Sequence, residues 1–423
     1  MHKPYNNGSD KENSLKKSFQ EITDVDIKKS PAEWIDGFLC YIQAHGGAAA
    51  VWRLPDTDEV HLLADLSGGQ AIENFELQAL DPGFLIAPFQ NTLYKNIYLK
   101  ADLQLSLKIE VNSFENKELT AEVRADKANH KESFLQFLKS KQGDFHIPSK
   151  GKIQSTDKDT YISTVLKGIQ AIKQERIFKV VTSKVKVVPN QGNLQIGHAF
   201  MKASLRYKNA FVNLTYTPYS GLWLGASPET LIENLEHKHF KTVALAGTQL
   251  ATERPISETA WTQKEIEEQA YVSRYIINCF KKIRLREYAE IGPKTVQAGN
   301  LLHLKTTYKV NTHEVNFPEL ASVMLDLLHP TSAVCGMPKE ASINFLNQQE
   351  QHDRAYFSGY LGPLQQDGYT HLFVNLRCCQ ISKEQVCFYA GAGITEDSNP
   401  EKEWIETEMK CQVLADIVFD PAD

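Results

Sequence analysis

The amino-acid sequence predicts an α+β fold with extensive antiparallel sheet. Strand-like segments follow one another along most of the chain, and only a few long helical segments separate them. No Gly-rich loop of phosphate-binding spacing is present. Strands that do not alternate regularly with helices favour α+β over a doubly wound α/β fold. With 423 residues and 42% hydrophobic content, the chain can bury a large core.

The N-terminal third of the sequence has no motif with a chemical role. Residues 1–18 are dominated by charged residues, Asn, Gly and Ser, so we expect a disordered lead there. Strand-like runs at 48–54 and 103–111 indicate that residues 19–150 form an N-terminal scaffold. The catalytic part is then expected within residues 151–420.

The remaining elements are predicted from hydrophobic periodicity. A helix is expected over residues 157–173, because Tyr161, Val165 and Ile169 recur at helical spacing behind the cap candidate Asp157. Strands are expected at 178–188, 210–217, 222–224, 241–245, 301–310, 371–376 and 386–389. Two long helices are expected near 262–284 and 400–418.

Composition excludes several classes of protein. The net charge of -6 argues against binding to nucleic acid or to an anionic membrane surface. The N-terminus lacks the apolar core of a signal peptide and no stretch resembles a membrane span, so we expect a cytoplasmic protein. Seven cysteines without metal-binding spacing are expected to be buried free thiols.

Lys179 is a candidate general base in the strand predicted over residues 178–188. Alternation places Lys179 on the face of Val181 and Val185, whereas Lys184 points the other way. An amine on an apolar face loses water, which favours the neutral form that a general base requires. The alternative is a lysine at the end of the strand that reaches solvent.

Glu229 is a candidate general acid. It follows a strand and the turn-forming pair Ser227-Pro228, which can aim a carboxyl group out of the sheet. In an apolar setting a carboxyl group has a raised pKa and can donate a proton to a leaving hydroxyl group. The alternative is a solvated glutamate at a surface turn.

Carboxylates lie on the expected buried faces of both long helices. Glu268 begins an apolar stripe one turn after Glu265, and Glu406 shares a face with Lys410 one turn after Glu403. A divalent cation between the helices would compensate for these charges, and oxygen ligands without His or Cys indicate Mg²⁺. Otherwise, Glu406 and Lys410 would form a surface ion pair.

Arg377 and a glycine pair are candidate anion-binding groups. In the strand that leads to Arg377, this residue alternates with Leu376, and its polar and aromatic neighbours suit bidentate binding of a carboxylate. Gly391 and Gly393 offer backbone N–H groups without side-chain obstruction. The alternative for the glycines is a tight turn that binds nothing.

Taken together, residues 155–415 resemble the chorismate-utilising enzymes: isochorismate synthases, salicylate synthases, anthranilate synthase large subunits and aminodeoxychorismate synthases. The motifs that carry the resemblance are KVV at 179–181, GASPE at 225–229, ALAGT at 244–248, HPTSAVCGMP at 329–338, Glu350 with Arg354, YFSGYLG at 356–362, NLR at 375–377, AGAGI at 390–394 and EWIETEMK at 403–410. The resemblance implies a layered sandwich of large antiparallel sheets with helices packed outside.

The resemblance also implies roles for matching residues. Lys179 looks like the base that activates water, and Glu229 like the acid that protonates the departing C4 hydroxyl group. The implied Mg²⁺ ligands are Glu268, Glu406, Glu403 and Glu265. The residues implied to bind the substrate, chorismate, are Gly247, Thr248, His329, Ala333, Arg377, Gly391, Gly393 and Lys410.

Within the family, the sequence is most similar to isochorismate synthases. Ala246 stands where aminodeoxychorismate synthases place a nucleophilic lysine, and anthranilate-type enzymes lack the base that matches Lys179. Water is then the expected nucleophile, adding at C2 as hydroxide leaves C4. The usual family pattern is not kept everywhere, since Ala355 stands where glycine often follows the arginine.

Other members of the family remain alternatives. A salicylate synthase, which also eliminates pyruvate, is the closest, followed by an anthranilate-type subunit and a catalytically silent binding protein. The motif at 329–338 and the N-terminal scaffold favour menaquinone biosynthesis over a siderophore pathway. We expect no obligatory protein partner.

Overall fold

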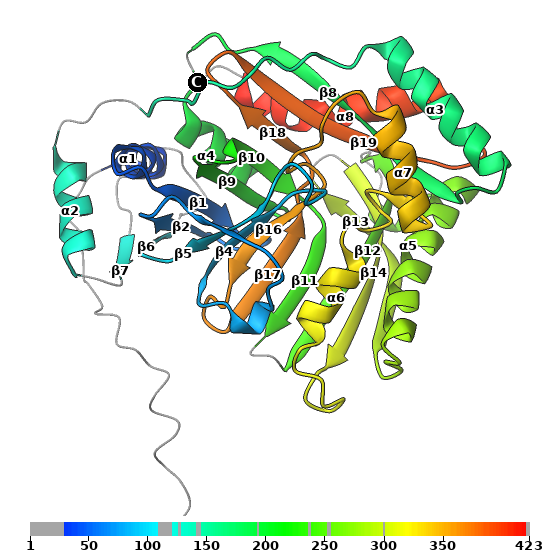
Figure 1. Ribbon diagram of the computed structural model, residues 1–423, viewed down its shortest axis with the longest axis horizontal. Coiled ribbons are helices and arrows are strands. Elements are labelled where there is room, and N and C mark those ends of the chain that lie inside the picture. The colour runs from blue at the N-terminus through cyan, green and yellow to red at the C-terminus, as the bar shows by residue number, and fades with distance from the viewer. Residues whose placement is uncertain are drawn as a thin grey trace, which may run out of the picture.

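Two large antiparallel sheets face each other, and helices cover their outer sides (Figure 1). This architecture confirms the predicted α+β fold. The computed structural model describes residues 29–108, 121–125, 128–140, 145–192, 194–235, 238–251, 255–298 and 301–419. The predicted N-terminal lead, residues 1–18, lies outside the described residues.

The first sheet combines strands from the whole length of the chain. In spatial order its strands are β15 (Gly336–Met337), β8 (Lys179–Pro189), β19 (Gln385–Ile394), β18 (Cys378–Ile381), β10 (Gly221–Ser227), β9 (Phe211–Thr217), β1 (Ala48–Arg53), β2 (Glu59–Asp65), β6 (Leu103–Lys108) and β7 (Ala121–Ala125). β8 and β19 form its longest pairing, with Lys184 opposite Ala390 and Val181 opposite Gly393.

The second sheet is also built from both parts of the chain. Its strands, in spatial order, are β13 (Ala289–Ala298), β14 (Leu301–Asn311), β12 (His239–Leu250), β11 (Thr230–Leu235), β17 (Tyr369–Val374), β16 (Tyr360–Leu364), β4 (Gly83–Ala87), β5 (Asn96–Lys100) and β3 (Gln70–Ile72). β4 pairs with β16 here, as β1 pairs with β9 in the first sheet, so strands from before residue 150 extend both sheets. The domain boundary near residue 150 stays a prediction.

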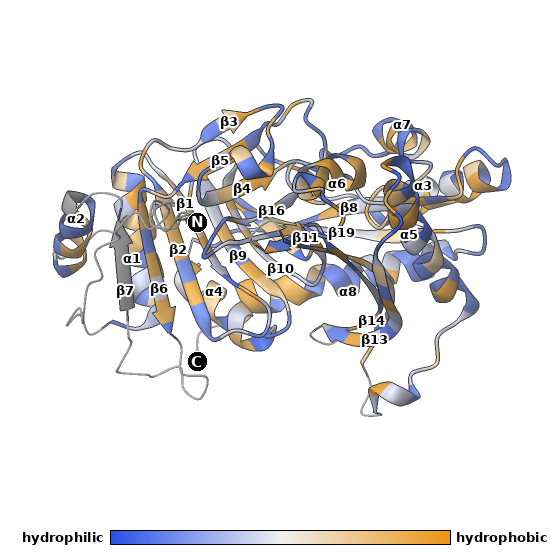
Figure 2. Ribbon diagram, turned by 90° about the horizontal axis from the view of Figure 1, so that it is seen from below, coloured by the Kyte–Doolittle hydropathy of each residue, from blue (hydrophilic) through white to orange (hydrophobic). Residues whose placement is uncertain are grey.

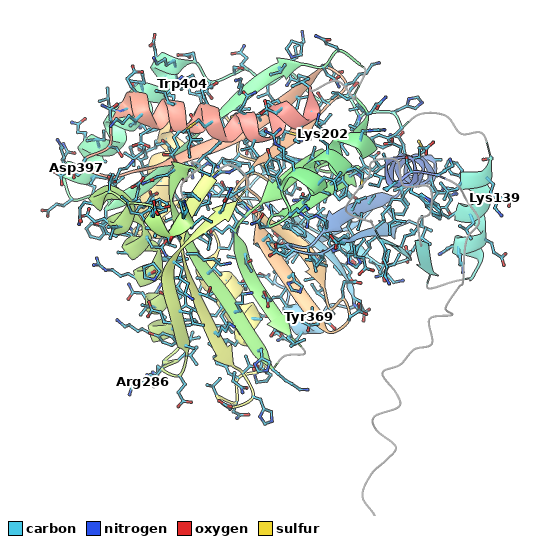
Figure 3. All side chains as sticks on the ribbon, turned by 180° about the vertical axis from the view of Figure 1, so that it is seen from behind. Lys139, Lys202, Arg286, Tyr369, Asp397 and Trp404 are labelled. Atoms are coloured by element: carbon cyan, nitrogen blue, oxygen red, sulfur yellow. The ribbon has the colours of Figure 1, made fainter. Side chains whose placement is uncertain are left out.

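The helices lie outside the two sheets. They are α1 (Pro31–Ala44), α2 (Ala128–Lys139), α3 (Lys158–Lys173), α4 (Ile196–Arg206), α5 (Gln263–Lys282), α6 (Leu320–Leu328), α7 (Lys339–Gln349) and α8 (Pro400–Val418), with short 3₁₀ turns η1 (Leu77–Ala79) and η2 (Ile256–Glu258). The three helices expected from the sequence are α3, α5 and α8. The cap predicted for α3 is present, since Asp157 accepts from the backbone N–H of Thr160, and Asn399 caps α8 by accepting from that of Lys402. Seen from behind, α8 lies across the first sheet with Trp404 near its N-terminal end (Figure 3).

Hydrophobic residues are concentrated in the strands of both sheets, and the helices carry hydrophobic and hydrophilic residues in turn (Figure 2). One cluster fills the space between the sheets, and two others lie between the sheets and the helices. In the cluster between the sheets, the rings of Phe211 from β9 and Phe373 from β17 stack with their centroids 4.1 Å apart. All seven cysteines are free thiols and six are buried, as predicted. None of the helices among the described residues has the length and apolar character that crossing a bilayer requires.

The contact between Phe211 and Phe373 gives a direct test of how the sheets adhere. Phe211→Ala should lower the free energy of unfolding by about 3–5 kcal/mol, because it removes a fully buried ring and leaves a cavity between the sheets. Urea denaturation measures the loss. Leu93→Ala is the control, since Leu93 is 79% exposed and should change stability by no more than about 0.5 kcal/mol. Equal stabilities for the two variants would contradict the described packing.

Candidate active site

A cavity lies where the two sheets meet α5 and α8. Its lining comes from β8 and β19 of the first sheet, from β12 and β14 of the second, and from both helices. The residues predicted from the sequence that line it are Lys179, Glu229, Gly247, Thr248, Glu268, Ala333, Arg377, Gly391, Gly393, Glu406 and Lys410. Glu265, Glu403 and His329 are not part of this lining.

Lys179 is fully buried at the start of β8 and faces the cavity. Its Nζ lies 3.0 Å from Oε1 of Glu268 on α5. The two lysines on the opposite face of the strand, Lys184 and Lys186, both pair with Glu408 of α8. The predicted alternation along this strand is therefore correct, and Lys179 is not a strand-end lysine that reaches solvent.

Gly393 makes room for the ion pair between Lys179 and Glu268. A Cβ atom at position 393 would lie 2.1 Å from Oε1 of Glu268 and 3.2 Å from Cε of Lys179. Gly391 and Gly393 lie within β19, so the alternative of a tight turn is wrong. The carbonyl of Gly391 accepts a hydrogen bond from Nζ of Lys410 at 2.8 Å.

Glu229 is buried two residues after the end of β10. Its carbonyl accepts from the N–H of Val374, and its N–H donates to Oγ of Ser227, which fixes the turn. Burial raises the pKa of the Glu229 carboxyl to about 8, although Lys179 and Arg377 act to lower it. The carboxyl group is therefore mostly protonated at neutral pH, and the alternative of a solvated surface glutamate is wrong.

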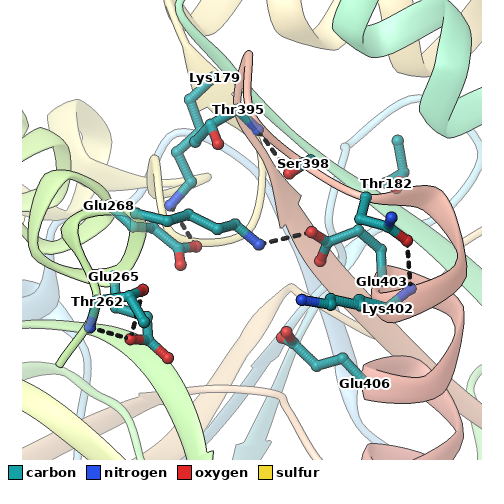
Figure 4. Close-up of polar contacts among 12 residues, drawn as sticks. Lys179, Thr182, Thr262, Glu265, Glu268, Thr395, Ser398, Lys402, Glu403 and Glu406 are labelled. Atoms are coloured by element: carbon teal, nitrogen blue, oxygen red, sulfur yellow. Dashed lines mark hydrogen bonds and ion pairs between the residues drawn. The ribbon is translucent and has the colours of Figure 1, made fainter. Parts of the chain in front are cut away.

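The carboxylates that α5 and α8 turn toward each other form ion pairs with nearby lysines (Figure 4). Glu403 pairs with Lys264 at 2.5 Å, and Glu406 pairs with Lys410 at 2.6 Å. Burial acts to raise the pKa of Glu268, but the ammonium groups of Lys179 and Lys264 outweigh burial and hold that pKa below its usual value. These pairs explain how a protein of net negative charge concentrates cations in one cavity.

The other two predicted metal ligands differ in their surroundings. Glu265 closes a capping box at the start of α5, where Oε2 accepts from the N–H of Thr262 at 2.7 Å. Glu403 is almost fully buried, and burial raises its pKa despite the nearby Lys264. Its Oε2 has no hydrogen-bond partner among the described residues. Of Glu265 and Glu403, only Glu403 therefore has a buried carboxylate oxygen without a hydrogen-bond partner among the described residues.

The donor set suits Mg²⁺ in part. Within the described ranges, no group of three or more His, Cys, Asp or Glu is arranged to hold a metal ion. Glu268 and Glu406 nevertheless line the same cavity, and Mg²⁺ commonly binds one or two protein carboxylates together with waters and substrate oxygens. Glu403 is drawn beside this pair in Figure 4, but it pairs with Lys264 and lies outside the cavity lining. The residues therefore fit a magnesium ion that keeps most of its own waters.

Arg377 reaches the cavity from an unusual backbone conformation. β17 ends at Val374, and Arg377 has φ of 46°, so the predicted alternation with Leu376 is wrong: both side chains line the cavity. Burial lowers the pKa of Arg377 to about 10, and Glu406 opposes this shift, so the group stays cationic. Its guanidinium makes no hydrogen bond to the described residues, which leaves its donors available for a carboxylate.

His303 is a lining residue that sequence reasoning missed. It lies in β14, and its Nδ1 is 2.7 Å from the carbonyl of Gly247, which sits in a β-bulge with φ of 70°. Its Nε2 is buried without a partner among the described residues. Burial lowers the pKa of His303 to about 3, so the ring is neutral. A lone histidine in a strand carries no signal that distinguishes this position.

His329 lies outside the cavity lining, contrary to the predicted role in substrate binding. Its Nε2 lies 3.0 Å from the carbonyl of Pro88, and its ring packs edge-on against Tyr360. The histidine therefore joins the segment after α6 to the second sheet. Motif membership alone could not separate this packing role from contact with a ligand.

A buried lysine, a buried carboxyl group with a raised pKa and paired carboxylates and cations share one cavity of the antiparallel sandwich. The model of the family described as "Chorismate binding enzyme" matches residues 95–419. The chain therefore belongs to the chorismate-binding enzyme family.

Named relatives and solved structures agree with this family. The chain is 29% identical over 203 residues to the vibriobactin-specific isochorismate synthase of Vibrio cholerae, a match covering 45% of this chain and 49% of the relative. It is 28% identical to the isochorismate synthase EntC of Escherichia coli, covering 47% and 51%. The chain thus spans about half the length of these curated relatives.

The fold is similar to that of solved members of the family. The menaquinone-specific isochorismate synthase MenF of Escherichia coli superposes with a TM-score of 0.70 at 19% identity, covering 90% of this chain and 91% of that one. Anthranilate synthase component I of Streptococcus pneumoniae gives 0.61 at 16% identity, covering 94% and 95%. At these identities the likeness shows the fold.

Glu229 should make stability depend on pH. Its folded pKa of about 8 exceeds the ordinary value of 4.5 expected in the unfolded chain. As pH rises between these values, the unfolded chain loses a proton that the folded chain keeps, so the protein loses stability. Relative to Glu229→Gln, the loss should reach up to about 1.4 kcal/mol per pH unit, measured by urea denaturation. Parallel pH profiles for the two proteins would mean that Glu229 is ionised when folded.

Gly393→Ala tests the close approach of Glu268 to β19. The new methyl group would displace the carboxylate, so the free energy of unfolding should fall by about 1–3 kcal/mol. Gly151→Ala is the matched control, because nothing lies within 4 Å of a Cβ there. Thermal and urea unfolding of both variants measure the difference. A Gly393→Ala protein as stable as the control would contradict the described contact.

Proposed function

We propose that this chain is an isochorismate synthase, an isomerase that converts chorismate to isochorismate by adding water at C2 with loss of the C4 hydroxyl group. The observation that carries the proposal is that Lys179 and Glu229 line one cavity while Glu229 keeps its proton. A base and an acid in one cavity allow water to be activated and a hydroxyl group to leave within one site.

The two groups have complementary tasks. Lys179 must first give up the proton of its ion pair with Glu268, and its neutral amine then takes a proton from water as the oxygen bonds to C2. The ring double bonds shift, the bond between C4 and its oxygen breaks, and Glu229 gives its proton to the departing hydroxyl, which leaves as water. One water enters and one leaves, so the reaction is an isomerisation that needs no oxidant or second substrate.

The cationic side of the cavity suits a substrate with two carboxylates. Arg377 and Lys410, which line the cavity, would hold the enolpyruvyl carboxylate together with the backbone around Gly391. Magnesium, held by Glu268 and Glu406 with Glu403 and Glu265 nearby, would supply the positive charge that holds the ring carboxylate. Gly247, Thr248 and Ala333, which line the same cavity, would complete the wall around the ring.

The pathway is a separate proposal. We assign the chain to menaquinone biosynthesis, on the form of the motif at 329–338 and on the N-terminal strands that extend both sheets. Relatives of both kinds support an isochorismate synthase, since one is named for vibriobactin and another for menaquinone. Deleting the gene should abolish menaquinone and leave catechol siderophores unchanged, and the reverse result would favour a siderophore pathway.

Incubating the purified full chain with chorismate and Mg²⁺ tests the activity, with chromatography of the products. Isochorismate should accumulate, and EDTA should stop turnover. Salicylate with pyruvate would show a salicylate synthase instead, and anthranilate formed with ammonium would rule out water as the nucleophile.

Variants of the two reactive groups test the mechanism. Lys179→Ala and Glu229→Gln should each lower kcat by about 10²–10⁴-fold, the usual contribution of general acid–base catalysis. Lys186→Ala is the matched control, because this lysine lies on the same strand and pairs with Glu408 outside the cavity. Unchanged turnover in either of the first two variants would refute the assigned roles.

A further inference from the structure

Arg354 is a buried arginine whose donors connect two walls of the cavity. It follows α7 and is 4% exposed. Its NH1 group donates to the carbonyl of Val334 at 2.7 Å, and its NH2 group donates to the carbonyl of Val181 at 2.7 Å. Val181 belongs to β8, Val334 belongs to the segment between α6 and β15, and both line the cavity.

Glu350 fixes Arg354 in place. The pair is bidentate, with Nε to Oε2 at 2.8 Å and NH2 to Oε1 at 2.6 Å. Oε1 of Glu350 also accepts from the N–H of Ser183 at 2.7 Å and from its hydroxyl group at 2.9 Å. Burial acts to raise the pKa of Glu350, but Arg354 outweighs it and holds the pKa low. The ion pair is thereby attached to β8 at two points.

The two carbonyls that Arg354 contacts belong to segments close to the candidate base and the candidate acid. Val181 lies two positions after Lys179 on β8. The segment that carries Val334 also contains Ala333, and both residues line the cavity that Glu229 lines. Arg354 therefore bridges the strand of the candidate base and the loop beside the candidate acid.

A guanidinium group suits this bridge better than any other side chain. Its planar fork donates to several acceptors in fixed directions, whereas a lysine has one nitrogen on a flexible stem. A buried ion pair is weak evidence for stability, since well-packed apolar side chains of equal volume often stabilise as much. The geometry of the contacts therefore points to a role in the cavity's shape.

We propose that Arg354, oriented by Glu350, is a positioning residue that sets the spacing between the Lys179 strand and the 331–334 loop beside Glu229. The inference rests on the proposed function for its effect on turnover. Its effect on the surroundings of Glu229 does not require that function.

The first experiment compares Arg354→Lys with Arg53→Lys. Arg53 is the matched control, because it is 3% exposed, donates to backbone carbonyls such as those of Tyr207 and Lys208, and lies away from the cavity. At a temperature where both variants are folded, Arg354→Lys should lower kcat/KM for chorismate by about 10²-fold, mainly through kcat. Arg53→Lys should lower the melting temperature and leave kcat/KM unchanged.

The second readout is the ionisation of Glu229, followed by the infrared band of its protonated carboxyl group. In Arg354→Lys the band should be lost at a pH about one unit lower or more, because a displaced loop admits water to Glu229. In Arg53→Lys it should be unchanged. If the wild-type protein does not convert chorismate, the proposed function fails, and this titration still decides the role of Arg354.

Ser183→Ala covers the case in which Arg354→Lys does not fold. It removes one hydrogen bond to Glu350 and should lower kcat/KM about three- to tenfold, the effect of about 1 kcal/mol. A folded Arg354→Lys with wild-type kcat/KM and wild-type Glu229 titration overturns the proposal. An Arg53→Lys protein with the same losses of kcat/KM and of the Glu229 band also overturns it. If Arg354→Lys fails to fold, a Ser183→Ala protein with wild-type kcat/KM overturns it.

Discussion

The structure of this site depends on keeping a carboxyl group protonated a short way from buried cations. Coulomb attraction from Lys179 and Arg377 acts to ionise Glu229, and burial opposes it and prevails. That balance requires Glu229 itself to be shielded from bulk water, and its side chain is buried. The two sheets, α5 and α8 all contribute residues to the lining of the cavity.

Charge elsewhere in the cavity is arranged in pairs. Glu268, Glu403 and Glu406 each have a lysine partner at 3.0 Å or less. A divalent cation bound to these carboxylates would take over as counter-charge for part of the set. Pairing of this kind lets the helices carry acidic residues on buried faces, where an isolated carboxylate would be strongly unfavourable.

Sequence reasoning found most of this site because its residues lie on regular elements. Period-2 alternation placed Lys179 on the correct face of β8, and helical spacing placed Glu268 on the buried stripe of α5. It failed where the chain leaves regular structure: Arg377 has a positive φ, so alternation could not predict its direction. His303 was missed because the β-bulge that brings Gly247 to it depends on pairing between distant strands. His329 shows the opposite error, in which a motif residue packs against Pro88 and Tyr360 outside the cavity lining.

The helices and the N-terminal strands also differ in how far local sequence patterns could predict them. α3, α5 and α8 have clear caps and were predicted, whereas the strands before residue 150 could be recognised only as scaffold. Their partners in the two sheets lie far along the chain, and local patterns contain no information about such pairing.

Difference infrared spectroscopy of the wild-type protein against Glu229→Gln tests the central claim most directly. The account predicts the carbonyl stretch of a protonated carboxylic acid at pH 7, absent in the variant and lost in the wild-type protein near pH 8. An ionised Glu229 at pH 7, with no such band, would contradict it.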